Sequence, residues 1–277
     1  MNLNLNVDNN LQNKLKQLTD FFKNKKVVVA FSGGVDSGVL AYLSNKYAKE
    51  TLLITEKSIL YPEDEIKEAK MFAKKYNIPH KIIERDPLEH ELFRKNPLNR
   101  CYICKKGLYE DIKKIAASKG FDIIIDGTNI DDLSDYRPGL DALKELGIEM
   151  PYIKFKINKN EIRKIAELFN LEIKSKPSMA CFSSRIPYNQ EITEEKLERI
   201  RKAEQFLKKT FNLSQLRVRY HENDLARIEI LPEEFNIILN KTAFSQICRE
   251  LKNLGFNYIT LDMEGYRSGS MNEPLKI

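Results

Sequence analysis

The stretch VVVAFSGGVDSG, residues 27–38, joins an apolar run to a glycine turn and then to the start of a helical pattern. The adjacent glycines Gly33 and Gly34 let the backbone turn tightly, so that successive N–H groups point toward one anion. A helix N-terminus adds partial positive charge at the same place, and Ser32 and Ser37 offer hydroxyl donors. The stretch therefore predicts a phosphate-binding loop between a strand and a helix.

The order of strand and helix around this loop repeats along the first part of the chain. Strands are expected at residues 27–31, 51–55, 80–85 and 121–128, and helices at 38–49, 62–76 and 105–119. Such alternation indicates an α/β fold in which helices flank both faces of a parallel sheet. Ligands of open parallel sheets bind beyond the carboxyl ends of the strands, which is where the glycine loop is expected.

The pattern changes in the last third of the chain. A charged helix is expected at residues 194–209, followed by strands at 215–221, 225–231 and 257–262. A stretch rich in proline and serine, residues 176–192, separates the two patterns. We therefore expect two domains: residues 1–180 with the phosphate loop, and residues 181–277 with a smaller α+β fold for substrate binding or oligomerisation.

The composition is that of an ordinary soluble protein. Of 277 residues, 42% are hydrophobic and 31% are charged, and the net charge is +6. No apolar run approaches the ~18 residues of a membrane span, and the first residues lack the layout of a secretory signal. We therefore expect a cytoplasmic protein with no membrane partner. The modest positive charge suits an anionic substrate, whereas nucleic-acid binding would require a basic domain.

The cysteines form a second candidate site. The chain has four. Cys101 and Cys104 form a C-x-x-C pair in RCYIC, in an expected loop, and Cys181 lies in KPSMACFSSRIPY at the domain boundary. Three thiolates are one short of a structural zinc site, but they can hold a 4Fe-4S cluster with one open iron. Alternatively, Cys181 acts alone as a nucleophile or sulfur donor beside a redox pair. Cys248 in FSQICRE is expected to be a buried apolar filler.

A polar segment, DGTNIDDLSDYRPG at residues 126–139, follows the last expected strand of the first domain. It therefore also belongs to the ligand edge of the sheet. Its residues Asp131, Asp132 and Asp135 can cap turns. Together with Asp36 they can instead supply hard oxygen ligands for a Mg²⁺ ion that bridges phosphates.

Several segments together resemble the LarE family of PP-loop ATP pyrophosphatases. They are SGGVDS, NPLNRCYICKKGLY, GTNIDDLSDYRPG, KPSMACFSSRIPY, LRVRYH with LARIEI, and YRSGSMNE, and they follow the family's order. The resemblance as a whole covers nearly the entire chain, from about residue 10 to 273. LarE proteins are ATP-dependent sulfur transferases that help to build the nickel-pincer nucleotide of lactate racemase. Because Cys101 and Cys104 accompany Cys181, the sequence is similar to the three-cysteine members of the family.

The resemblance implies an adenine nucleotide alpha-hydrolase-like fold and a reaction in two steps. ATP adenylates a carboxylate of a pyridinium biscarboxylate mononucleotide, and a protein-borne sulfur then displaces AMP to leave a thiocarboxylate. In three-cysteine members, residues matching Cys101, Cys104 and Cys181 are expected to hold a 4Fe-4S cluster that delivers sulfur repeatedly. The sulfide source stays open, as does whether Cys181 is a cluster ligand or a sacrificial donor.

The resemblance also implies which residues bind ATP and substrate. The expected ATP ligands are Ser32, Gly33, Gly34, Val35, Asp36, Ser37, Thr128 and Asn129, with Mg²⁺ on Asp36 and Asp132. The small anionic mononucleotide is expected to bind Arg185, Arg217 and Arg219, of which the last two share one face of a strand. A homo-oligomer is expected by analogy with the family.

Two other functions fit part of this pattern. PP-loop tRNA sulfurtransferases also combine an ATP site with a C-x-x-C pair and a third cysteine, but the small net charge argues against RNA as the partner. A non-catalytic zinc-binding interaction protein would bind zinc through its cysteines and turn over no ATP.

Overall fold

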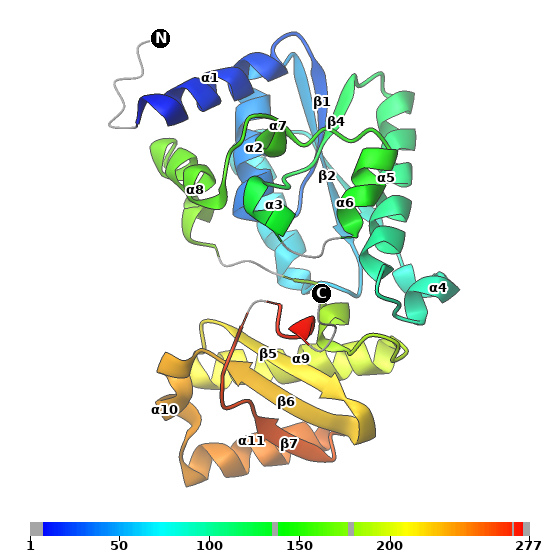
Figure 1. Ribbon diagram of the computed structural model, residues 1–277, viewed down its shortest axis with the longest axis vertical. Helices are drawn as coiled ribbons and strands as arrows, with labels where there is room; N and C mark the ends of the chain where they lie inside the picture. The colour runs from blue at the N-terminus through cyan, green and yellow to red at the C-terminus, as the bar shows by residue number, and fades with distance from the viewer. Residues whose placement is uncertain (1–7, 135–137, 177–179, 268, 274–277) are drawn as a thin grey trace. The chain divides into compact units, whose positions relative to one another are not determined.

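The computed structural model describes residues 8–134, 138–176, 180–267 and 269–273 (Figure 1). The chain forms two compact units. The first comprises Met1–Ser58, Glu63–Arg85 and Asn99–Met179, and the second comprises Ile59–Pro62, Asp86–Leu98 and Ala180–Ile277. Two short segments from the first part of the sequence therefore belong to the second unit. Among the helices of the described residues, none combines the length and apolarity that crossing a bilayer requires.

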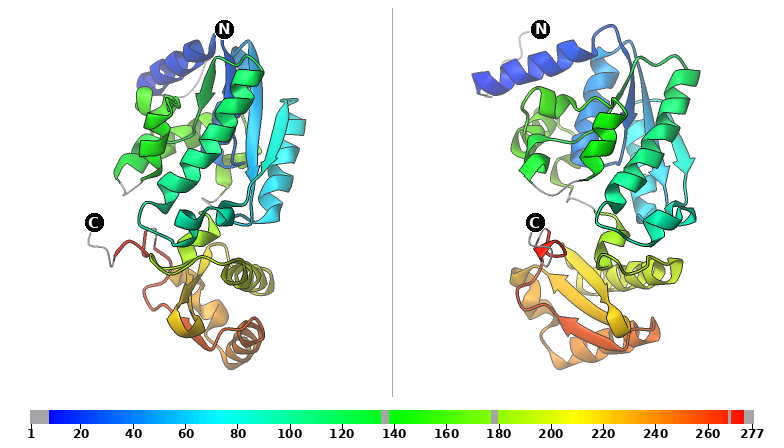
Figure 2. Two further views of the ribbon diagram at one scale, coloured as in Figure 1. Left: turned by 90° about the vertical axis from the view of Figure 1, so that its right-hand side faces the viewer. Right: turned by 45° about the vertical axis from the view of Figure 1, so that its right-hand side comes forward.

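The first unit is built on a parallel sheet. Its strands are β1 (Lys26–Ala30), β2 (Glu50–Lys57), β3 (His80–Glu84) and β4 (Ile123–Ile125). Their order is β3-β2-β1-β4, and each neighbouring pair is parallel, which confirms the predicted fold class (Figures 1 and 2).

The strand order brings the carboxyl ends of β1 and β4 side by side. β1 pairs with β2 on one edge and with β4 on the other, so the chain moves outward from β1 in both directions. A crevice forms at such a reversal of strand order, and open α/β sheets bind their ligands there. The glycine loop follows β1 and the polar segment follows β4, so both lie at the reversal.

Alternate residues of β1 point into two separate cores. Val27 and Val29 belong to one core and Val28 to the other. The first core includes residues of the helices α1 (Asn9–Phe22), α2 (Val35–Tyr47), α3 (Glu63–Lys75) and α8 (Lys159–Leu168), together with Tyr152. The second includes residues of α5 (Arg100–Ser118) and α6 (Gly139–Glu145). Successive strand side chains point to opposite faces, so a strand covered on both faces is apolar throughout, as residues 27–29 are.

The helix after the glycine loop, α2, is buried around most of its circumference. Gly38 in its first turns has no room for a side chain, because a Cβ there would lie 2.1 Å from Cδ1 of Ile173. The 3₁₀ turn η3 (Glu172–Ser175) therefore packs directly on α2. Packing on several sides fixes the start of α2, and with it the loop.

The second unit is the smaller, mixed α+β region. Its sheet has the order β5-β6-β7, with β5 (Leu216–His221) antiparallel to β6 (Leu225–Ile230) and β7 (Tyr258–Leu261) parallel to β6. Helix α9 (Glu194–Phe211) contacts β5, and α11 (Lys241–Asn253) contacts β7. Shorter helices complete the two units; they are α7 (Pro151–Lys154) in the first and α4 (Glu91–Arg94) and α10 (Phe235–Ile238) in the second.

One cysteine lies elsewhere than expected. Cys248 is exposed on α11, not buried. The buried positions of this helix are Ala243, Ile247 and Leu251, which repeat at the helical period. A residue one position after Ile247 is rotated by about 100° around the helix, away from that stripe. The apolar neighbours of Cys248 in the sequence therefore do not surround it in space.

Asn96 attaches the segment Asp86–Leu98 to the rest of the second unit. Its side chain is fully buried, and its amide nitrogen Nδ2 donates to the carbonyl oxygens of Ile186 (3.3 Å) and Pro187 (2.7 Å). The backbone carbonyl oxygen of Asn96 accepts from the backbone N–H of Asn189 at 2.8 Å. With φ at +55°, Asn96 also has the left-handed conformation that asparagine tolerates better than most residues.

Replacing Asn96 by alanine is expected to lower the free energy of unfolding by about 2 to 4 kcal/mol. The change leaves the buried carbonyl group of Ile186 and the partly buried one of Pro187 without their amide donor, and it puts an alanine, which tolerates positive φ less well than asparagine, at that position. Urea unfolding followed by circular dichroism measures the loss.

Asn257 is a matched control. Its exposed amide also donates two hydrogen bonds, to the Asn223 carbonyl and to Asp224 Oδ2, each at 3.3 Å. Asn257→Ala should cost less than about 1 kcal/mol, because water replaces an exposed partner. Equal losses in the two variants would show that Asn96 has no special role.

Candidate active site

The glycine loop has the geometry of an anion cradle. Gly33 has φ at +76°, and Gly34 is the N-cap of α2, where no side chain of the described residues provides a capping bond. The first N–H groups of the helix are therefore open to a ligand. The hydroxyls of Ser32 and Ser37 lie 3.1 Å apart, and Ser37 Oγ also accepts from Ser32 N at 3.2 Å. The two serines thus hold the loop in its turn.

The segment after β4 closes on this loop at Gly127. A Cβ at that position would lie 3.0 Å from the backbone nitrogen of Ser37 and 3.3 Å from the carbonyl carbon of Asp36. Only glycine allows the backbones to approach so closely without displacement. Thr128 and Asn129, both buried, follow directly, so the predicted ATP ligands from two distant parts of the sequence lie at one place.

Asp126 orients this segment. One carboxylate oxygen accepts from the backbone N–H of Thr128 at 2.7 Å and from its hydroxyl, and the other accepts from Tyr109 Oη. The ammonium of Lys105 lies 3.5 Å away. Burial raises the pKa of Asp126, but Lys105 and the hydrogen bonds from Thr128 and Tyr109 outweigh it and leave the pKa below its usual value. Asp126 is therefore an ionised residue that fixes Thr128 in place.

Asp36 forms an ion pair with Lys159, the first residue of α8. Asn129 Nδ2 lies 3.5 Å from Asp36 Oδ1, and Tyr152 Oη donates to the Asp36 carbonyl oxygen at 2.9 Å. Burial, with a smaller contribution from the charge of Asp132, raises the pKa of Asp36, although Lys159 opposes the shift. The carboxylate thus lies in a partly desolvated position where a second cation would be favourable.

The other aspartates of the segment make local bonds. Asp132 Oδ2 accepts from Asn129 N, and Asp131 Oδ2 accepts from Lys159 N, each at 2.9 Å. Asp135 lies outside the described residues. Within the described part of the chain, no group of three or more His, Cys, Asp or Glu side chains is placed to hold a metal ion. A Mg²⁺ ion on Asp36 and Asp132 would therefore need phosphate oxygens as further ligands, which is how Mg²⁺ is commonly bound beside nucleotides.

Cys101 and Cys104 lie in the first turns of α5, not in the loop that the sequence suggested. The helix begins at Arg100 because the carbonyl oxygen of Asn99 already accepts from the N–H groups of Tyr102 and Ile103, at 2.9 and 3.3 Å. A spacing of three residues puts both thiols on one face of the helix. Cys101 is exposed and Cys104 half-buried.

Cys181 belongs to the second unit, whereas Cys101 and Cys104 belong to the first. It is half-buried and precedes the 3₁₀ turn η4 (Phe182–Arg185), and its Sγ lies 2.9 Å from Ser183 Oγ. The backbone around it is held by Arg185, whose Nη1 donates to the carbonyl oxygens of Ala180 (2.8 Å) and Cys181 (3.0 Å).

The three arginines predicted to bind substrate have different surroundings. Arg185 is fully buried and forms a two-point ion pair with Glu204, at 2.9 and 3.1 Å. Arg219 is bound by Glu229 at 2.7 Å and by the Ser184 carbonyl oxygen at 3.1 Å. Both guanidinium groups are therefore occupied by protein acceptors.

Arg217 lacks such a partner. It is 6% exposed, yet within the described residues no carboxylate forms an ion pair with it. Its Nη1 donates to the Leu216 carbonyl oxygen at 2.7 Å, and its guanidinium lies over the ring of Tyr266, 5.2 Å from the centroid. Burial, with the positive charge of Arg185, lowers the pKa of Arg217 to about 10. It is a desolvated cation for which an anionic ligand would be favourable.

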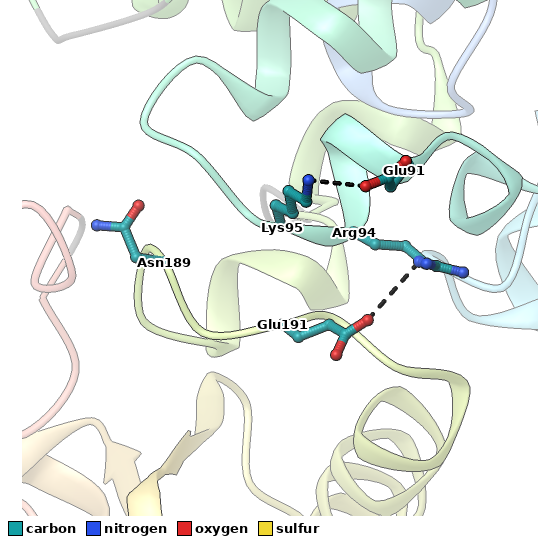
Figure 3. Close-up of a pocket in the computed structure, with 5 residues that line it drawn as sticks. All are labelled: Glu91, Arg94, Lys95, Asn189 and Glu191. Atoms are coloured by element: carbon teal, nitrogen blue, oxygen red, sulfur yellow. Dashed lines mark ion pairs between the residues drawn. The ribbon is translucent and has the colours of Figure 1, made fainter.

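A pocket of about 250 Å³ lies elsewhere in the second unit (Figure 3). Its lining residues are Glu91, Arg94, Lys95, Asn189 and Glu191. Figure 3 shows that the charged side chains pair among themselves, Lys95 with Glu91 at 2.7 Å and Arg94 with Glu191 at 3.7 Å. The pocket contains none of the residues predicted from the sequence, and its charges are already compensated.

Comparison with known proteins adds a family context. Residues 7–136 match the PP-loop domain family. An uncharacterized protein of Synechocystis is 38% identical over 267 residues, which are 96% of this chain and 99% of that protein. Pyridinium-3,5-bisthiocarboxylic acid mononucleotide synthase of Lactiplantibacillus plantarum is 33% identical over 257 residues, 91% of this chain and 90% of that enzyme. A tRNA-specific 2-thiouridylase of Rickettsia rickettsii is 28% identical over 200 residues, 58% of this chain and 54% of that enzyme.

Replacing Gly33 by alanine is expected to weaken ATP binding by at least tenfold. A residue with a Cβ disfavours the φ of +76° by about 1 to 2 kcal/mol, so the loop relaxes and its N–H groups lose their common direction. Isothermal titration calorimetry with ATP measures the effect.

Gly147→Ala is the matched control for backbone strain. Gly147 has nearly the same φ, +69°, and a Cβ there would meet no atom within 4 Å. Both variants should lose similar stability, but only Gly33→Ala should lose ATP affinity. Wild-type affinity in Gly33→Ala would mean that the loop is not the anion site.

Proposed function

Because the chain belongs to the PP-loop family and, within it, to the LarE group, we propose that it is an ATP-dependent sulfurtransferase that converts a carboxylate of a pyridinium biscarboxylate mononucleotide into a thiocarboxylate. The observation that carries this proposal is the 33% identity to a pyridinium-3,5-bisthiocarboxylic acid mononucleotide synthase over 91% of the chain. The uncapped start of α2 at the reversal of strand order supports it, because ATP needs such a phosphate site.

The first step activates a carboxylate that would otherwise lack a leaving group. A substrate carboxylate oxygen attacks the α-phosphorus of ATP, the bond from that phosphorus to the β-phosphate oxygen breaks, and pyrophosphate leaves with the electron pair. In this proposal the loop of residues 32–37 binds the pyrophosphate end, so its N–H groups stabilise the charge that develops on the leaving group. Mg²⁺ on Asp36 and Asp132 would neutralise the same phosphates.

The second step replaces AMP by sulfur. A sulfur nucleophile attacks the carbonyl carbon of the acyl adenylate, and the bond from that carbon to the AMP oxygen breaks, so that AMP leaves with the electron pair. When the sulfur then separates from its donor, the product is a thiocarboxylate. The two steps must share one cavity, since an acyl adenylate hydrolyses if water reaches it.

The sulfur donor in this proposal involves Cys101, Cys104 and Cys181. The first two fit as neighbouring cluster ligands, because about one turn of α5 separates them; Cys181 is the third ligand expected from the family resemblance. A 4Fe-4S cluster held by these thiolates would supply a sulfide at its open iron. If Cys181 gives up its own sulfur instead, its Cβ–S bond breaks, the Cα proton is lost, and dehydroalanine remains.

Arg217 is the best candidate to bind the phosphate or free carboxylate of the substrate. It is a buried cation that forms no ion pair within the described residues, and an anion would relieve its desolvation. Arg185 and Arg219 serve this site indirectly, because their bonds to Glu204, Glu229 and the backbone of residues 180–184 hold the Cys181 segment. We therefore assign them positioning roles.

Thiolation of tRNA is the second candidate function. The similarity to a tRNA-specific 2-thiouridylase favours it, but that similarity extends over only 58% of this chain. Filter binding with tRNA at physiological salt separates the two functions, because tight binding with formation of thiouridine would replace the mononucleotide by tRNA as substrate.

Replacing Cys101 or Cys104 by serine is expected to abolish the absorbance near about 400 nm of the anaerobically purified protein and to stop multiple turnover. Iron and acid-labile sulfide analysis, with mass spectrometry of the thiocarboxylate product, provides the measurement. Cys248→Ser is the control, because that thiol is exposed on α11 in the second unit.

Two outcomes would change this assignment. Unaltered absorbance in both variants would reject the cluster. A mass decrease of about 34 Da at Cys181 in the wild-type protein after turnover, one H₂S, would instead identify Cys181 as a sacrificial donor.

Replacing Arg217 by glutamine is expected to weaken binding of nicotinic acid mononucleotide, a pyridinium carboxylate with a phosphate, by about 10- to 100-fold. ATP affinity should stay within about twofold, because in this proposal Arg217 binds the second substrate and the loop of residues 32–37 binds ATP. Calorimetry measures both affinities. Arg249→Gln on the exposed face of α11 is the control and should change neither.

The riboside without the phosphate identifies the group that Arg217 contacts. In the wild-type protein the mononucleotide should bind more tightly than the riboside, and Arg217→Gln should remove most of that difference. An equal loss of ATP affinity would contradict the assignment of Arg217 to the second substrate.

A further inference from the structure

Lys176 places an ammonium group beside the phosphate loop. Its Nζ lies 3.7 Å from the position that a Cβ on Gly33 would take, as close as the carbonyl oxygen of Glu65. The lysine side chain is 15% exposed, so it reaches this position through the protein and not across open solvent. No signal in the sequence suggested this contact, because Lys176 follows the loop by more than half of the chain.

Two carboxylates hold the ammonium group. Lys176 Nζ lies 2.6 Å from Glu65 Oε2 and 2.6 Å from Glu68 Oε2, both on α3. An ammonium group has three N–H donors, and these ion pairs use two of them. The third N–H donor has no partner among the described residues. Because the ammonium group is adjacent to the loop, this donor is available to a ligand bound there.

The acidic pair would be unfavourable beside an anion without this lysine. Glu65 and Glu68 bring two negative charges to the rim of a loop whose N–H groups and helix dipole suit a phosphate. Like charges at such distances repel by an amount that grows as water is excluded. Lys176 contacts both carboxylates and also lies beside Gly33 of the loop, so its charge compensates them at that place.

The backbone before Lys176 is anchored independently. The backbone N–H of Lys176 donates to the carbonyl oxygen of Ile173 at 3.0 Å, and Ile173 packs against Gly38 of α2. Arg163 on α8 donates to the carbonyl oxygens of Lys174 and Lys176. The position of the ammonium group is thus set by α2, α3 and α8 together, which limits the freedom that a lysine on a surface would have.

We propose that Lys176 contacts the β- or γ-phosphate of ATP bound at the loop of residues 32–37, and that Glu65 and Glu68 are positioning residues that hold its ammonium group there. The proposal rests on the proposed function, since it needs ATP in that loop. It adds a residue to the pyrophosphate side of the site and specifies the end of the nucleotide at which that residue acts.

The protonation of Lys176 agrees with this role. Burial lowers its pKa, but the hydrogen bonds and charges of Glu65 and Glu68 outweigh burial and raise the pKa above its usual value. The group therefore stays positively charged throughout the neutral range. An alternative is that the ion pairs only fasten α3 to the segment around Lys176, without any contact to a ligand.

The test compares the affinities of ATP, pyrophosphate and AMP for the Lys176→Met variant of the full chain, by isothermal titration calorimetry. Methionine keeps much of the side-chain length and removes the charge. If Lys176 contacts the outer phosphates, the Kd of ATP and of pyrophosphate should rise at least tenfold, and the Kd of AMP should stay within twofold. Lys176→Arg keeps a cation and should recover part of the ATP affinity.

Two further variants separate a ligand contact from a structural ion pair. Lys67→Met is the control, because Lys67 lies on the same helix and pairs with Asp64 in an exposed position. It should leave all three affinities unchanged. Glu68→Gln removes one of the two carboxylates that hold the ammonium group. It should weaken the binding of ATP and pyrophosphate, but less than Lys176→Met does, because Glu65 still holds the cation, and it should leave AMP affinity unchanged.

The results have distinct meanings. If Lys176→Met folds with wild-type urea stability and binds ATP and pyrophosphate as the wild type does, the inference is overturned and the proposed function stands. The inference also fails if Lys176→Met lowers the affinity for AMP as much as the affinity for ATP. It fails too if Lys176→Met and Glu68→Gln weaken ATP binding by the same factor and both lose stability, because the ion pairs would then have a structural role only. A wild-type protein that binds neither ATP nor pyrophosphate would reject the proposed function itself.

Discussion

The close approach of two backbones at Gly127 is the constraint on which the candidate site depends. A Cβ there would lie 3.0 Å from Ser37 N, so glycine lets the segment after β4 approach the first turn of α2 without displacing either backbone. The strand order makes the contact possible, since β4 is the direct neighbour of β1. Once the two segments meet, Thr128 and Asn129 lie beside the loop. Thr128 is then held by the carboxylate of Asp126, and the amide of Asn129 lies next to the carboxylate of Asp36.

Local patterns predicted the parallel sheet, the glycine loop and the second, mixed region, because each depends on periodicity or on turn chemistry within a few residues. Long-range pairs gave no comparable signal. Lys159 bonds to Asp36 across 123 residues of chain, and Lys176 bonds to Glu65 across 111. Two local expectations were wrong. Cys101 and Cys104 were expected in a loop, but α5 begins before them, because the Asn99 carbonyl oxygen accepts its first hydrogen bonds. Cys248 was expected to be buried, but it lies beside the apolar stripe of α11.

The arginines of the second unit show why residue type alone does not assign a role. Arg185 and Arg219 are both almost fully buried, and each has a glutamate and backbone carbonyl groups as partners, so their charges are compensated. Removing a partner from such a pair would leave a buried charge, which is why these side chains are structural anchors of the Cys181 segment. Arg217 differs because no carboxylate among the described residues forms an ion pair with it; its guanidinium group donates to a carbonyl oxygen and lies over an aromatic ring.

Charge compensation has a related consequence at the phosphate loop. Both lysines near it are paired in the absence of a ligand, Lys159 with Asp36 and Lys176 with the two glutamates of α3. Pairing keeps each ammonium group charged and oriented, so little reorganisation is needed when an anion arrives. It also sets a threshold, because a ligand must interact with these cations at least as well as carboxylates do. A polyphosphate with several charged oxygens meets that threshold more readily than a single carboxylate or a neutral nucleoside, so the paired lysines favour the polyphosphate end of a nucleotide.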